Sequence, residues 1–248
     1  MPLSLRFMGV NLKLTGKAEL TTAIEQASAS NPVRVATPNP EFILLACENP
    51  QFKAALENMT HHVVDGFGLS LALKFSGKTG ESSQKYAGID LVEDLFSRYS
   101  GGEKSFALVG GYEGAAAKRA DLLRKQYPHI KIVAALRGGA ISPDAPVDPS
   151  LLRELEAASP DILMLGFGAP KQELWIASAA NSKIPVMIGV GGSLNFASAK
   201  KRAPKLVQAI QMEWLWRALT EKGHAKRAWR ATAGFIVAFL LSSFSRKT

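Results

Sequence analysis

The stretch DILMLGFGAPKQELWI, residues 161–176, decides the fold class. Its apolar run DILML is typical of a buried strand, and Gly166, Gly168 and Pro170 mark a turn before the helical pattern KQELWI. Residues 185–196, PVMIGVGGSLNF, repeat this order, with an apolar strand that ends in glycines. Two glycine-lined strand ends so close in sequence predict one shared ligand crevice.

The same alternation of apolar runs and helical patterns extends along most of the chain. Apolar strands between amphipathic helices indicate an α/β fold, with a mostly parallel Rossmann-like sheet that helices cover on both faces. We expect one α/β domain over residues 1–198 and a basic, partly apolar helical appendage over residues 199–248. The expected strands are VRVAT, HHVVDG, KSFALVG, KIVAAL, DILMLG and PVMIGVGG.

The composition of the 248-residue chain excludes several classes of protein. Its single cysteine, Cys47, excludes a disulfide framework and a multi-cysteine metal site. Cys47 lies on the apolar face of an expected helix, so we expect a packed thiol. Residues 1–14, MPLSLRFMGVNLKL, contain neither the long apolar core nor the small-residue cleavage pattern of a signal peptide. We therefore expect a cytoplasmic protein.

Charge is distributed unevenly along the chain. Residues 1–199 contain 19 basic and 19 acidic residues, whereas residues 200–248 contain 11 basic residues and only Glu213 and Glu221 as acids. The C-terminal segment thus carries the entire formal net charge of +9. A neutral body with a basic end predicts an anionic partner at that end. Apolar residues interrupt the charge of the tail, which disfavours nucleic acid as that partner.

Residues 231–245 contain no charged side chain. As a helix these 15 residues would span roughly 22 Å, which is less than the bilayer core of about 30 Å. Basic residues around the segment favour a helix that lies in the membrane interface, and they predict peripheral attachment to an anionic membrane surface. The alternative is a terminal helix that packs on the body or on another subunit, as in a homo-oligomer.

Several common nucleotide and hydrolase motifs are absent from the sequence. LVGGYEGAAAKRA, residues 108–120, places glycines between a strand and a helix but does not meet the G-x-G-x-x-G spacing of dinucleotide-binding proteins. The chain also lacks the G-x-x-x-x-G-K-[ST] phosphate loop and the G-x-S-x-G motif of α/β-hydrolases. His61 and His62 have no ligand partners at helical spacing. We therefore expect no metal and no redox cofactor.

Asp65 is the most distinctive acid of the chain. VVDG, residues 63–66, puts it where an apolar strand ends, and Gly66 and Gly68 give a ligand close access to the backbone. A carboxylate at such an edge can accept a proton from a hydroxyl group as a general base. The alternative is that Asp65 only caps the helix LSLALKF that follows it.

Glycines at strand ends can bind a diphosphate through their backbone N–H groups. In GFGAPKQE, Gln172 offers both donor and acceptor groups to a ligand. Lys171 and Glu173 are either site residues or solvated helix charges, and Trp175, one turn further, is expected in the core. The glycines that we name as candidate substrate-binding residues are Gly110, Gly168 and Gly191.

Seven short motifs occur in an order that resembles one known family. They are T-x-N (37–39), VDG-x-G (64–68), LVGG (108–111), GFGAPKQE (166–173), GVGG (189–192), KRAP (201–204) and EWLWR (213–217). This order resembles the WecG/TagA/CpsF glycosyltransferases, also called glycosyltransferase family 26. The resemblance covers nearly the whole chain.

The resemblance implies an inverting, metal-independent transfer of a sugar from a UDP-sugar to a sugar on polyprenyl diphosphate. The reaction would serve bacterial surface polysaccharide synthesis at the inner face of the plasma membrane. Asp65 would be the base that deprotonates the acceptor hydroxyl, with Thr37 and Asn39 beside it, and Gln172 would lie in the donor pocket. The basic appendage would complete the site and contact the diphosphate. Its candidate substrate-binding arginines are Arg202, Arg217 and Arg227.

The sequence also departs from the pattern of that family. His224 stands at an arginine position, Lys222 at a proline position, Gly138-Gly139-Ala140 at a glycine-tyrosine-phenylalanine triplet, and Asn195 and Ser198 at an aspartate and a glycine. These departures bear on donor identity and tail geometry more than on the reaction class. They leave open an alternative, a non-catalytic membrane-associated protein that binds a nucleotide-sugar or a lipid diphosphate.

Overall fold

The computed structural model describes residues 2–111, 114–138 and 148–197, together with Pro204, Gly234, Phe235, Ala238 and Phe239. These residues form one eight-stranded sheet, in the order β1-β2-β4-β3-β8-β7-β5-β6. All neighbouring strands are parallel except β1 and β2, so the expected mostly parallel α/β sheet is confirmed. The strands are β1 (Leu3–Phe7), β2 (Val10–Leu14), β3 (Val33–Ala36), β4 (His61–His62), β5 (Ser105–Gly110), β6 (Lys131–Leu136), β7 (Ile162–Gly166) and β8 (Val186–Gly189).

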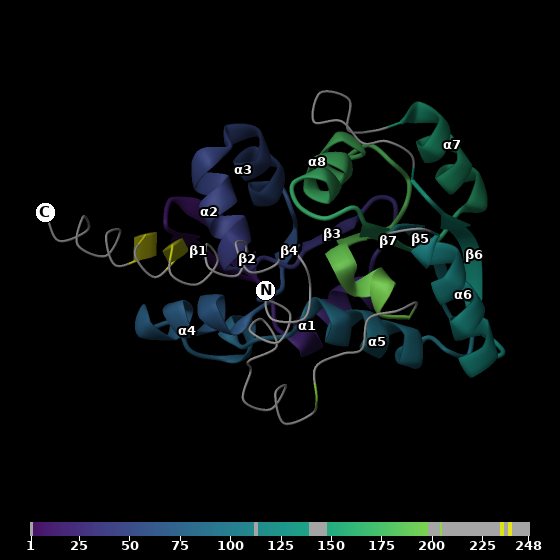
Figure 1. Ribbon diagram of the computed structural model, residues 1–248, viewed down its shortest axis with the longest axis horizontal. Coiled ribbons are helices and arrows are strands. Elements are labelled where there is room, and N and C mark those ends of the chain that lie inside the picture. Colours follow the sequence, from purple (N-terminus) through teal and green to yellow (C-terminus); the bar gives the residue numbers. More distant parts are fainter. Residues whose placement is uncertain are drawn as a thin grey trace, which may run out of the picture.

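Helices cover both faces of this sheet (Figure 1). One layer contains α2 (Pro40–Glu48), α3 (Pro50–Glu57), α7 (Pro149–Ala158) and α8 (Lys171–Ser178). The opposite layer contains α1 (Lys17–Glu25), α5 (Gly88–Arg98) and α6 (Ala115–Gln126). The remaining helical elements are α4 (Phe67–Phe75) and the short 3-10 helices η1 (Glu81–Ser83) and η2 (Gly191–Ala197).

The apolar run of β7 supplies both layers of the core. Successive side chains of a strand point to opposite faces, so Leu163 and Leu165 join the cluster under α2, α3 and α8, whereas Ile162 and Met164 join the cluster under α1, α5 and α6. Both faces of the central strands are therefore buried. Trp175 of α8 is fully buried in the first cluster, as expected for a core residue.

An antiparallel hairpin of β1 and β2 forms one side of the sheet. The sequence interpretation missed this hairpin. Strands β1 and β2 pair from Leu3 with Leu14 to Phe7 with Val10. Met8 and Gly9 connect them, and both have positive φ, 48° and 79°, which is typical of a two-residue turn of type I′. The alternation LSLRF and VNLKL on either side of Met-Gly is the signal that predicts such a hairpin.

Part of the C-terminal apolar segment lies against this hairpin. The ring of Phe7 is 6.4 Å from that of Phe235 and 5.7 Å from that of Phe239, measured between centroids. Phe235 is only 2% exposed. This contact favours the alternative in which the segment packs on the body, whereas most of the appendage over 199–248 lies outside the described residues.

Two further observations bear on the expectations from composition. Cys47 is exposed, with its thiol 3.5 Å from the carbonyl oxygen of Met8, so the prediction of a packed thiol is wrong. The buried face of α2 instead contains Phe42, Ile43 and Ala46. Within the part of the chain that the structure describes, no helix has both the length and the apolar character needed to cross a bilayer.

Candidate active site

The carboxyl ends of the parallel strands meet at one edge of the sheet. At this edge β5 leads to α6 and β7 leads to α8, and these two helices cover opposite faces (Figure 1). Adjacent strands that exit to opposite faces create the crevice in which open α/β sheets bind ligands. The described candidates of the sequence analysis all follow, or end, strands at this edge.

Asp65 lies at this edge, three residues beyond the end of β4. Its backbone N–H donates to the carbonyl oxygen of Pro38 at 2.8 Å, which joins the segments after β3 and β4. The side chain is half-buried. Gly66, rather than Asp65, occupies the N-cap position of α4. The structure therefore does not support the alternative that Asp65 serves as that cap residue.

Two hydroxyl groups lie near the Asp65 carboxylate, around Gly88 at the start of α5. A Cβ atom on Gly88 would lie 3.6 Å from Ser193 Oγ, 3.7 Å from Thr37 Oγ1 and 3.8 Å from Asp65 Oδ2. These three side chains come from three different strand ends and point to one place. The sequence analysis named Thr37 but missed Ser193, which follows the glycines of GVGGS and is 7% exposed.

The segment after β3 is held by side-chain hydrogen bonds. Thr37 Oγ1 donates to the carbonyl oxygen of Gly189 at 3.1 Å, which ties the end of β3 to the end of β8. Asn39 Oδ1 accepts from the N–H of Phe42 at 3.1 Å and so caps α2. A Cβ atom on Gly66 would lie 3.7 Å from Asn39 Cβ. Thr37 and Asn39 thus both lie beside the Asp65-Gly66 turn.

Gln172, in the first turn of α8, joins the two glycine turns that opened the sequence analysis. Its Oε1 accepts from the N–H of Gly168 at 3.2 Å and from the N–H of Gly191 at 2.9 Å. Its Nε2 donates to Glu173 Oε1 at 2.7 Å. The side chain is 1% exposed, so protein atoms engage both ends of the amide. Its expected place in a donor pocket remains a prediction.

Glu173 is fully buried, so the interpretation as a solvated helix charge is wrong for this residue. Its Oε2 has no hydrogen-bond partner among the described residues. Burial raises the pKa of Glu173 from 4.5 to about 8, and the hydrogen bond from Gln172 offsets part of this effect. Lys171 is exposed, as expected for a solvated charge.

The remaining candidates divide between the described edge and the rest of the chain. Gly110 ends β5 beside Gly166 of β7, and a Cβ atom there would meet the ring of Phe167 at 2.8 Å, so the close approach requires glycine. Asn195 of η2 is buried, with its Oδ1 2.9 Å from where a Cβ of Gly111 would lie. Gly139, Ala140, Ser198, Arg202, Arg217, Lys222, His224 and Arg227 lie outside the described residues.

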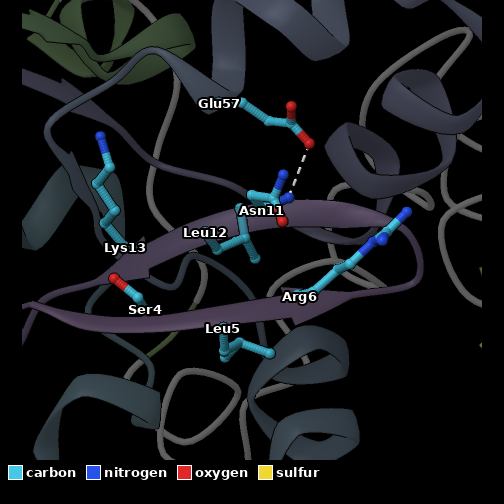
Figure 2. Close-up of a pocket in the computed structure, with 7 residues that line it drawn as sticks. All are labelled: Ser4, Leu5, Arg6, Asn11, Leu12, Lys13 and Glu57. Atoms are coloured by element: carbon cyan, nitrogen blue, oxygen red, sulfur yellow. Dashed lines mark hydrogen bonds between the residues drawn. The ribbon is translucent and has the colours of Figure 1, made fainter.

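A hollow of about 280 Å³ lies elsewhere, between the N-terminal hairpin and the end of α3. Figure 2 shows that Arg6 and Lys13 extend from its two strands and that the N–H of Asn11 donates to Glu57 Oε1, at 2.8 Å. None of the predicted site residues lines it. The described residues for which the sequence predicts chemistry therefore lie at the carboxyl edge and not in this hollow.

Comparison with known proteins identifies the family of the chain. A sequence model of the Glycosyl transferase WecG/TagA/CpsF family matches residues 5–248. A protein of Staphylococcus aureus (strain MRSA252), named N-acetylglucosaminyldiphosphoundecaprenol N-acetyl-beta-D-mannosaminyltransferase, is 31% identical over 222 residues, which cover 86% of this chain and 84% of that protein. The protein of the same name from strain NCTC 8325 / PS 47 is 28% identical over 220 residues, with the same coverage. The resemblance seen in the motifs is thus confirmed, and the chain belongs to the WecG/TagA/CpsF family of glycosyltransferases.

Proposed function

We propose that this glycosyltransferase moves a sugar from a UDP-sugar to a sugar on polyprenyl diphosphate, with inversion at the anomeric carbon and without a metal ion. The names of the two relatives support the acceptor, because both specify an N-acetylglucosaminyl-diphosphoundecaprenol. The same names support N-acetylmannosamine as the transferred sugar. We therefore take UDP-N-acetylmannosamine as the first donor to test.

The observation that carries this proposal is the convergence of Asp65, Thr37 and Ser193 around Gly88. In the proposed reaction the Asp65 carboxylate accepts the proton of the acceptor hydroxyl, and the resulting oxygen attacks the anomeric carbon while the bond to UDP breaks. Thr37 and Ser193 supply hydroxyl groups that orient the acceptor beside that carboxylate. One base and one acceptor hydroxyl account for a single displacement, which inverts the configuration.

The departing UDP needs positive charge or N–H donors when no metal neutralises it. Preorganised donors in a water-excluded site stabilise developing charge far better than water does. We assign the diphosphate to the side of the crevice formed by Gly110, Gly168 and Gly191, where glycine lets a ligand approach the backbone closely. The N–H groups of Gly168 and Gly191 themselves donate to Gln172. Guanidinium groups of Arg202, Arg217 and Arg227 are proposed to complete the neutralisation, since arginine binds phosphate oxygens through paired donors.

The lipid-linked acceptor places the reaction at a membrane surface. We propose that the protein attaches peripherally to the inner face of the plasma membrane through the basic residues of the segment 199–248, while Phe235 and Phe239 of that segment pack on Phe7. Removal of these residues is expected to release the protein from vesicles that contain anionic lipid and to reduce transfer. Retention of the shortened chain on those vesicles would place the attachment elsewhere.

A product assay tests the proposed function directly. The full chain is incubated with UDP-N-acetylmannosamine, or with UDP-N-acetylglucosamine or UDP-glucose in parallel, and with a short-chain prenyl-diphosphate-N-acetylglucosamine. Mass spectrometry should detect a disaccharide lipid and UDP, at a rate that excess EDTA does not change. No product with any donor would favour the non-catalytic binding protein, and a rate that EDTA abolishes and Mg²⁺ restores would contradict the metal-independent mechanism.

A further inference from the structure

The Gln172 amide holds together the turn that contains Gly168 and the turn that contains Gly191, a residue nineteen positions after Gln172 itself. Its oxygen accepts from two N–H groups, those of Gly168 after β7 and Gly191 after β8. Both groups are donors, so only the amide oxygen can satisfy them, and a rotated amide would set its own N–H groups against them. The spacing of the two turns therefore depends on which way this amide faces.

The Glu173 carboxyl group fixes that orientation from the other side. Its Oε1 accepts from Gln172 Nε2 at 2.7 Å, and this bond is possible only while the amide oxygen faces the two glycines. The carboxyl group is completely buried, and its Oε2 has no hydrogen-bond partner among the described residues. A buried carboxyl group destabilises a fold unless it is fully hydrogen-bonded, so its presence in the core requires a reason.

Gly189 separates this buried pair from the candidate active site. A Cβ atom on Gly189 would lie 2.7 Å from Gln172 Nε2 and 3.0 Å from Glu173 Oε1, so the pair packs directly against the backbone of β8. The carbonyl oxygen of Gly189 also accepts the hydrogen bond from Thr37 at 3.1 Å. Glu173 is thus linked to the site through Gln172 and Gly189.

We infer that Glu173 is a positioning residue of the transfer site, which acts through Gln172 by orienting the amide that sets the spacing of the turns after β7 and β8. The inference rests on the proposed function, because those turns form the side of the crevice assigned to the UDP portion of the donor. Glu173 touches no substrate in this account. Its loss should therefore weaken the binding of UDP and spare the acceptor.

A double-mutant cycle tests this inference, with UDP affinity from calorimetry and steady-state kinetics as the measurements. Glu173→Ala should raise the Kd for UDP and the KM for the UDP-sugar about tenfold, the factor expected when one buried hydrogen bond is lost. The KM for the prenyl-diphosphate acceptor should change by less than about twofold. Glu173→Gln should behave like the parent chain, because its amide oxygen can accept the same bond from Gln172.

Since Glu173 is inferred to act through Gln172, the effects of Glu173→Ala and Gln172→Ala on the Kd for UDP should not be additive. Once Gln172→Ala has weakened UDP binding, the further change Glu173→Ala should alter the Kd by less than about twofold. Glu154→Gln, on the exposed face of α7, is the matched control and should change nothing. Additive losses in the cycle, an unchanged Kd in Glu173→Ala, or an equal rise in both KM values would overturn the inference.

Two further results keep the test decisive. If Glu173→Ala does not fold, Gly189→Ala is measured in its place. The added methyl group would be too close to Gln172 and Glu173 and would displace both side chains. An unchanged Kd for UDP in Gly189→Ala would then overturn the inference. If the parent chain neither binds UDP nor transfers from any UDP-sugar, the proposed function fails and the inference fails with it. A parent chain that binds UDP, with a variant that binds it equally well, overturns the inference alone.

Discussion

The amino edge and the carboxyl edge of the sheet, where the parallel strands begin and end, each have an aspartate. The carboxylates of these two aspartates have different surroundings. Asp161 precedes β7 at the amino edge, where its Oδ2 accepts from the backbone N–H and from the hydroxyl of Ser105, both at 2.7 Å. Asp65 follows β4 at the carboxyl edge, beside the hydroxyl groups of Thr37 and Ser193. The Asp161 carboxylate ties β5 to β7, whereas the Asp65 carboxylate lies near the hydroxyl groups to which we assign the acceptor.

Arg34 extends the same contrast. It lies at the amino edge, 6% exposed, and its guanidinium donates to the carbonyl oxygens of Val33, Ile184 and Pro185 at 3.0 to 3.3 Å. Ligands of open α/β sheets bind at the carboxyl edge. We therefore infer a structural role for polar residues at the amino edge and a ligand-binding role for those at the carboxyl edge, whatever their residue type. We therefore expect changes at the amino edge to affect stability and changes at the carboxyl edge to affect transfer.

Arg34→Met should give the largest loss of stability. The substitution leaves buried carbonyl oxygens without their donor, which is expected to lower the free energy of unfolding by about 2–4 kcal/mol. Transfer per folded molecule should not change. Urea denaturation and product assays measure the two quantities, with Arg153→Met on the exposed face of α7 as the control. A loss of transfer without a loss of stability would break the division between the edges.

Glu173 should make stability fall as pH rises. Burial raises its pKa in the folded chain from 4.5 to about 8, so between these values the folded chain keeps a proton that the unfolded chain has released. The contribution of Glu173 to stability is therefore most favourable below pH 4.5, declines through this window and is constant above pH 8. Denaturation from pH 5 to pH 9 should show a smaller decline in Glu173→Gln than in the parent chain. An equal decline of the free energy of unfolding with pH in the parent chain and in Glu173→Gln would contradict the raised pKa of Glu173.

Asp161→Asn should have a moderate effect on stability. Its side chain keeps one oxygen for Ser105 but loses the charge that strengthens the two hydrogen bonds, so we expect a loss of about 1–2 kcal/mol in the free energy of unfolding. Denaturation and the product assay again separate stability from transfer. A fall in transfer beyond the unfolded fraction would mean that the amino edge takes part in the chemistry.

Gly88→Ala should have the smallest effect. Its methyl group would make ordinary contacts of 3.6 to 3.8 Å with Ser193, Thr37 and Asp65. The free energy of unfolding should therefore change by less than about 1 kcal/mol. The methyl group narrows the space between the hydroxyls and the carboxylate, so the KM for the acceptor should rise a few-fold while the KM for the donor stays constant. An opposite pattern in the two KM values would assign this place to the donor.

The periodicity of the sequence predicted the sheet, and local signals explain what it missed. The expected runs all contain strands of the parallel sheet, because a strand buried on both faces is a continuous apolar run. The hairpin was missed although its alternation is visible, and so were α1 and α3. The side chain of Asn49 caps α3 by accepting a hydrogen bond from the N–H of Phe52. The Asn49-Pro50 pair, inside an apolar helical run, is the signal that α2 ends and α3 begins there.

The site was predictable only in part, because burial depends on contacts between distant segments. The strand-end pattern indicated Asp65 and the family resemblance indicated Thr37 and Asn39, and in the structure all three follow the neighbouring strands β3 and β4. The burial of Glu173 follows from the pairing of β7 with β8, which places Gly189 against α8, and no local pattern contains that information. Ser193 was missed for the same reason, because its neighbours Thr37 and Asp65 are far away in sequence.

The most direct test of the central claim compares binding and transfer in Asp65→Asn. Because an amide cannot accept the proton of the acceptor hydroxyl, single-turnover transfer should fall by a factor of about 10² to 10⁴, while the Kd for UDP and the free energy of unfolding stay within about twofold and 1 kcal/mol of the parent chain. Asp121→Asn, on the exposed face of α6, should transfer normally. Transfer at the parental rate by Asp65→Asn would contradict the assignment of Asp65 as the base.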